Sequence, residues 1–119
     1  MGIRILALTV LSLTVAPVRA GDRVAVRVSP RIAFAPADLT VLATLEAHPD
    51  NRVMEIVAES EDFYRSSEIP LEGELAAKAT FVRFQGLPSG QYAVRVVVRG
   101  SQGQRLAASQ AIVDIVGRR

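Results

Sequence analysis

The sequence predicts an all-β protein, an antiparallel sandwich of about seven strands that follows a signal-peptide helix. Apolar and polar residues alternate with a period of two in several segments. These segments are separated by Pro, Gly, Asn and Asp, and no long stretch has the spacing of an amphipathic helix. Since alternation puts the apolar side chains of a strand on one face, two such layers can enclose a core.

Residues 1–20 have the pattern of a cleavable secretory signal. Arg4 precedes an apolar run from Ile5 to Ala16, and Val18 and Ala20 occupy the positions that signal peptidase reads. The run is about a dozen residues, whereas a membrane-spanning helix needs roughly 20. We therefore expect cleavage after Ala20 and no stable membrane insertion afterwards. Residues 21–119 would form one exported domain, in the periplasm or outside the cell.

The first half of this domain predicts strands at residues 23–29, 39–47 and 52–58. Pro30 should end the first strand or shift its edge, and residues 32–35 could continue it. Residues 48–51, His-Pro-Asp-Asn, have the chemistry of a turn. The expected inward side chains of the three strands are Val24, Val26 and Val28; Leu39, Val41, Ala43 and Leu45; and Met54, Ile56 and Ala58.

In the second half, residues 92–99 form the clearest strand, with Tyr92 and three valines inward. Residues 63–75 predict only a short edge strand around Phe63 and Tyr64, and 79–84 predict another strand. A loop at 100–103 leads into a last strand at 106–116. The apolar residues of that strand change phase, which a bulge near Ser109 or Gln110 would explain. Most of the six aromatic residues are expected in the core.

The segment from Val82 to Val94 carries a motif, Leu87-Pro88-Ser89-Gly90-Gln91-Tyr92, at the entry to the clearest strand. It resembles the turn before the penultimate strand of fibronectin type III and bacterial immunoglobulin-like domains, and the corner of carboxypeptidase-regulatory-like sandwiches. The resemblance implies an immunoglobulin-like fold in which Tyr92 is buried and its hydroxyl bonds to nearby backbone. Gly90 would permit a close approach and Leu87 would plug the end of the sandwich. A fold-level resemblance implies no activity.

Charge argues against nucleic acid as a partner. The whole chain has a net charge of +2, but without Arg4 and Arg19 the basic and acidic residues balance at 12 each. A neutral domain lacks the excess of cations that binds polyphosphate. Acidic residues concentrate between Glu46 and Glu74 and basic residues after Leu75. We interpret these as solvated faces of neighbouring strands that pair with each other, although such a dipole could also steer a partner.

The residues of this chain do not predict an enzyme. His48 is the only histidine and the chain has no cysteine, so neither a multi-histidine metal site nor disulfides can form. No nucleophile elbow accompanies the serines, and no cofactor is expected. The loop from Glu59 to Asp62 could coordinate calcium, but it lacks the spacing and glycine of an EF-hand, and a solvated acidic loop is favoured.

Phe63, Tyr64 and Arg65 are the candidate binding residues. Neighbouring residues on a strand face opposite ways, so one of the two aromatics should point away from the core. An outward aromatic beside an arginine is typical of an interface anchor. An equally weighted alternative is that the following loop covers this aromatic side chain. The domain is thus expected to be a non-enzymatic module that binds a protein through a sheet face, edge or loop. The alternative is a calcium- or carbohydrate-binding accessory domain of an exported enzyme system, and a small hydrolase is a weaker option.

Overall fold

The computed structural model describes residues 23–117, which form eight strands and one 3-10 turn. The predicted signal segment and its cleavage site lie outside the described residues. The elements are β1 (Val24–Ser29), β2 (Ile32–Phe34), β3 (Ala37–Leu45), β4 (Val53–Glu59), β5 (Tyr64–Pro70), η1 (Gly73–Leu75), β6 (Ala79–Leu87), β7 (Gly90–Arg99) and β8 (Arg105–Val116).

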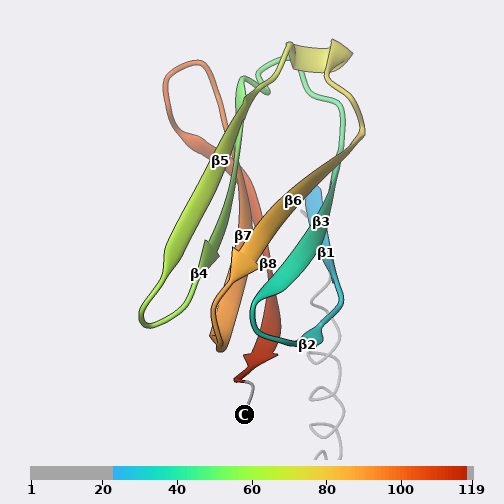
Figure 1. The fold of residues 1–119 in the computed structure, drawn as a ribbon. Helices are drawn as coiled ribbons and strands as arrows, with labels where there is room; N and C mark the ends of the chain where they lie inside the picture. The colour runs from blue at the N-terminus through green and yellow to red at the C-terminus, as the bar shows by residue number, and fades with distance from the viewer. Residues whose placement is uncertain (1–22, 118–119) are drawn as a thin grey trace, which may run out of the picture.

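The strands form two sheets that pack face to face (Figure 1). The smaller sheet has the order β1-β3-β6, and the larger has the order β2-β8-β7-β4-β5. Except for β2, which runs parallel to β8, all neighbouring strands are antiparallel. The predicted all-β sandwich is therefore confirmed, with one strand more than the seven or so that we expected.

The core lies between the sheets and consists of the side chains that the alternation assigns to the inner faces. Tyr92, Val94 and Val96 on β7 are fully buried, as are Leu39 and Val41 on β3. Met54, Ile56 and Ala58 on β4 are fully buried as well. At roughly 25 cal/mol per Å² of buried apolar surface, packing of this kind is the main stabilising contribution in a domain without disulfides.

The first strand ends at Pro30 as predicted, but residues 32–34 do not continue it. They cross to the other sheet, where Ile32 pairs with Asp114 and Phe34 with Val116. Pro30 causes this change because it has no N–H group to continue the pairing with β3. The second strand of the chain therefore pairs with the last strand at one edge of the larger sheet.

The region from Phe63 to Leu75 is more regular than the sequence predicted. Instead of a short strand, β5 has seven residues that pair along the whole of β4, from Glu59 with Tyr64 to Val53 with Pro70. Pro70 is tolerated because it closes the end of an edge strand. Gly73 has φ of 57° and starts the 3-10 turn.

The predicted bulge near Ser109 or Gln110 is wrong. Pairing between β7 and β8 is irregular at the start of β8, where Arg99 lies opposite Arg105. From there Ala107, Ser109 and Ala111 face inward half-buried, in phase with the buried Val113 and Ile115. Small residues face both ways in this strand, so its hydrophobic pattern is weak and suggested the false change of phase.

The expectation that most aromatics are core residues is also wrong. Tyr92 and Phe84 are buried and Phe63 is half-buried, but the exposed fractions of Phe34, Tyr64 and Phe81 are 67%, 56% and 68%. Each of these three follows or precedes an inward residue on its strand, and alternation turns it outward.

Candidate functional site

The tyrosine at the motif is held inside the end of the sandwich. The Tyr92 hydroxyl donates a hydrogen bond to the Pro88 carbonyl at 2.8 Å. Leu87 is fully buried beside it. Gly90 has φ of 153°, and a Cβ there would lie 3.2 Å from the Ser60 Cβ. Burial raises the pKa of Tyr92 above its usual 10.0. The Tyr92 side chain is therefore neutral and its hydroxyl is held by a hydrogen bond within the domain, so this corner has a structural role.

Two of the three predicted binding residues make contacts within the domain. The Phe63 ring packs edge-on against Tyr92, with centroids 6.3 Å apart. The Arg65 guanidinium lies 5.1 Å from the Phe63 ring centroid and donates to the Gln85 carbonyl at 2.7 Å. Arg65 thus links β5 of one sheet to β6 of the other. Tyr64 alone points outward, from the outer face of the larger sheet.

The acidic loop contributes one of its carboxylates to an ion pair. Glu59 Oε1 accepts a hydrogen bond from Arg95 at 2.9 Å, and Glu55 lies 3.7 Å from Arg99. These pairs join β4 to β7, so the acidic and basic parts of the sequence pair across neighbouring strands, as we interpreted. Within residues 23–117 no three His, Asp or Glu side chains are placed to hold a metal ion.

His48 lies half-buried in the predicted turn, where its Nδ1 accepts a hydrogen bond from the Asp50 amide at 3.0 Å. Asp50 in turn accepts from the Ser101 amide at 3.1 Å and from the Gln104 side chain at 3.0 Å. The Ser101 amide is the main reason that the pKa of Asp50 lies below its usual value. This group connects two loops and is occupied by structural hydrogen bonds.

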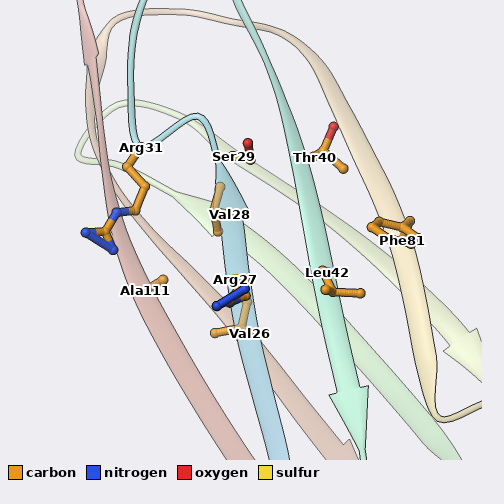
Figure 2. Close-up of a pocket in the computed structure, with 9 residues that line it drawn as sticks. All are labelled: Val26, Arg27, Val28, Ser29, Arg31, Thr40, Leu42, Phe81 and Ala111. Atoms are coloured by element: carbon orange, nitrogen blue, oxygen red, sulfur yellow. The ribbon is translucent and has the colours of Figure 1, made fainter.

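A hollow of about 480 Å³ lies over β1, the edge strand of the smaller sheet, and residues from both faces of that strand line it (Figure 2). Arg27 pairs with Leu42, and Leu42 pairs with Phe81, so these three side chains form one row across β1, β3 and β6. Their neighbours Val28, Val41 and Ala43 face the core, which leaves the row outward. Figure 2 shows Arg31 and Ala111 on the far side of β1.

The hollow combines an exposed aromatic with two arginines. Its lining has no carboxylate. In the part of the chain that the structure describes, the arginines in ion pairs are Arg52, Arg83, Arg95 and Arg99, which leaves Arg27 and Arg31 outside these pairs. The sequence did not reveal this row, because Arg27, Leu42 and Phe81 come from three strands whose register the sequence does not determine.

A second group of exposed apolar residues lies where β2 meets β8. Ile32 and Phe34 on β2, and Ile112 and Val116 on β8, are all exposed. The register puts Phe34 beside Val116, on the outer face of the larger sheet. Across the described residues, no helix has the length and apolar character needed to cross a membrane.

Comparisons with known proteins agree on the fold. The chain is similar to the CARDB domain of a Pyrococcus furiosus protein, with a TM-score of 0.52 and 10% identity over 85% of this chain and 100% of that one. It is similar to the PKD domain of an M14-like peptidase from a Thermoplasmatales archaeon, with a TM-score of 0.51 and 14% identity over 82% and 99%. A superoxide reductase from Ignicoccus hospitalis has a TM-score of 0.51 and 13% identity over 79% and 80%.

No family model matches the chain, and no curated protein matches it in sequence. The CARDB and PKD neighbours have immunoglobulin-like sandwich folds, as the motif around Tyr92 led us to expect. At such low identity these similarities establish the fold alone. The domain is therefore an immunoglobulin-like β-sandwich, and its function has to be argued from its own surface.

Proposed function

We propose that this protein is an exported, non-enzymatic module that binds a protein partner through the outer face of its smaller sheet. The observation that carries the proposal is the row of Arg27, Leu42 and Phe81 beside the hollow over β1. An aromatic residue with a neighbouring arginine is the composition of interface anchors. Phe81 is 68% exposed, so the fold covers only a minor part of its side chain.

The chemistry of the hollow favours an acidic, partly apolar partner segment. Full burial of a Phe side chain contributes roughly 1.5–3 kcal/mol, so Phe81 and Leu42 could supply much of the affinity. Arg27 and Arg31 would pair with carboxylates, since none lines the hollow itself. Charged rims of this kind mainly increase the association rate and the specificity.

The segment Phe63-Tyr64-Arg65 remains a second proposed surface, through Tyr64. Arg65 and Phe63 are engaged within the domain, so a partner there would contact Tyr64 on the outer face of β5. The two proposed surfaces belong to different sheets. Substitutions in one should therefore leave the other intact.

Affinity capture from the native exported fraction separates the two surfaces. The bait is the protein in the form that the cell accumulates, compared with Phe81→Ala, Arg27→Ala and Tyr64→Ala. We expect one partner to be lost with Phe81→Ala, to bind more weakly and with altered salt dependence with Arg27→Ala, and to be retained with Tyr64→Ala. Equal capture by all four forms would refute binding at either surface, and loss with Tyr64→Ala alone would transfer the site to β5.

The alternative function, a calcium- or carbohydrate-binding accessory domain, predicts a different experimental result. Calcium at the acidic loop would have to compete with Arg95 for Glu59. A ligand that binds only the folded form raises the melting temperature. A calcium-dependent rise that Glu61→Gln abolishes would favour this alternative over a protein partner.

A further inference from the structure

The outer edge of β8 is only partly paired. One side of this strand pairs with β7 along nearly its whole length. On the other side, β2 pairs only with Asp114, Ile115 and Val116. In the described domain, the stretch 105–113 therefore has no hydrogen-bonded strand on this side, although β1 of the smaller sheet packs close to β8.

This edge lacks the features with which proteins protect exposed strands. Charged residues, proline and short length discourage pairing with another chain. On β5 the protection comes from Glu68 and Pro70, and β1 carries Arg27 and ends before Pro30. From Leu106 to Val113, β8 reads Leu-Ala-Ala-Ser-Gln-Ala-Ile-Val, with no charge, proline or glycine. An eight-residue run of this kind is suited to adding a strand.

Apolar surface continues from this edge. Ile112 on β8 is 49% exposed, and Ile32 on the adjoining β2 is 70% exposed. Both lie on the outer face of the larger sheet, because Ile112 and Asp114, the partner of Ile32, alternate with the buried Val113. A strand added at the edge would cover part of this apolar surface as well as the backbone groups.

We propose that the occupant of this edge is β8 of a second copy, paired antiparallel so that two five-stranded sheets become one. The uncharged run complements itself, because no charge in it meets a like charge when two copies pair. A two-fold axis normal to the sheet makes the same surface serve both copies and closes the assembly at a dimer.

The pairing register follows from the alternation of side chains. Rotation about that axis keeps the outer faces of the two larger sheets on the same side. An even-numbered residue must therefore lie opposite an even-numbered residue of the second copy, and an odd-numbered residue opposite an odd-numbered one. Because β2 occupies the edge from Asp114 onward, the axis has to fall near the middle of 106–113. Ser109 or Gln110 then lies opposite its own copy, and Ile112 lies opposite Leu106 or Ala108 of the second copy.

Gln110 offers the sharpest test, since it is exposed on the outer face near the axis. Sedimentation velocity over a concentration series up to millimolar would measure the mass of the protein in the form that the cell accumulates, with its N-terminus defined by mass spectrometry. We expect a dimer that weakens roughly tenfold or more in Gln110→Lys and in Gln110→Glu, because like charges then lie directly or diagonally opposite each other across the axis. Mixing these two variants should restore dimers.

The matched control is Ser66→Lys, an exposed outward position on the β5 edge, which should leave the dimer unchanged. The proposal is overturned if the unmodified protein is a monomer throughout. A dimer that persists in Gln110→Lys, or is lost in Ser66→Lys, would place the interface elsewhere. Failure of the mixture to dimerise would exclude pairing of β8 with itself. Phe81 lies on the other sheet, so Phe81→Ala should leave this dimer unchanged, which keeps the two proposals distinguishable although Ala111 of this edge lines the hollow over β1.

Discussion

At the scale of single residues, the polar side chains that look most like functional groups hold the ends of the sandwich together. Asn51 is 1% exposed and donates from its side chain to the Glu46 carbonyl at 3.1 Å. The backbone carbonyl of Asn51 accepts from the Gly73 amide at 2.9 Å. The buried side-chain amide is costly to replace, because the Glu46 carbonyl would lose its donor.

The Tyr92 hydroxyl predicts a stability difference that depends on pH. Tyr92→Phe should lower the free energy of unfolding by about 1 kcal/mol at neutral pH, since it removes the hydrogen bond to Pro88. Burial raises the pKa of Tyr92, so its contribution is complete below the unfolded value of 10.0 and is lost as the pH rises beyond it. Denaturant unfolding at neutral pH and above pH 10 should show the gap between the two proteins closing. A gap that widens with pH would contradict a buried, neutral phenol.

Asp50 predicts the opposite dependence. Hydrogen bonding from the Ser101 amide lowers the pKa of Asp50 below 3.8, so its contribution is present above that value and is lost as the pH falls through the folded-state pKa. Asp50→Asn should melt at a lower temperature than the unmodified protein at neutral pH, and the difference should shrink towards pH 2. Glu61→Gln, at an exposed position, is the control. An unchanged difference across this range would count against the link between the two loops.

At the scale of elements, the position of β5 changes the meaning of its residues. Sequence reasoning singled out Phe63, Tyr64 and Arg65 together as an anchor. The full-length pairing of β5 with β4 puts Arg65 on the inner face, where it reaches Gln85 on the opposite sheet. The sequence could not predict this, because the contact joins strands of different sheets and depends on the register of each.

Substitution of Arg65 should therefore lower the free energy of unfolding, whereas substitution of Tyr64 should leave it nearly unchanged. Arg65→Ala should lower the free energy of unfolding by about 1 kcal/mol, through the lost hydrogen bond and the contact with the Phe63 ring. Tyr64→Ala, at an outward and exposed position, should change it by less than about 0.5 kcal/mol. Equal losses in denaturant titrations of the two variants would be inconsistent with Arg65 as the link between the sheets.

Strong alternation also explains which elements the sequence predicted well. β1, β3, β4 and β7 have large inward apolar residues and matched their expected faces. β8 is rich in alanine, and β2 has only three residues, whose partners are near the other end of the sequence. Weak patterns and distant pairing give no local signal, so the bulge was predicted at the wrong position and the sheet of β2 was not predicted.

At the scale of the whole molecule, strands from the two oppositely charged parts of the sequence pair in the larger sheet. Glu55 and Glu59 on β4 face Arg99 and Arg95 on β7, so part of the apparent dipole is cancelled between neighbouring strands. What remains distinctive is the surface away from these pairs: the arginines and Phe81 over β1, and the uncharged edge of β8. The proposed binding at these surfaces rests on the arrangement of the strands, which the sequence did not reveal.

Native-state hydrogen exchange of the backbone amides tests the sandwich itself most directly. β4 and β7 lie inside the larger sheet, and Val94, Val96 and Val98 of β7 are buried against the smaller sheet. Their amides should exchange only when the whole domain unfolds, and should be the slowest in the protein. If the amides of β7 exchange as fast as those of the edge strand β5, the two-layer core described here is wrong.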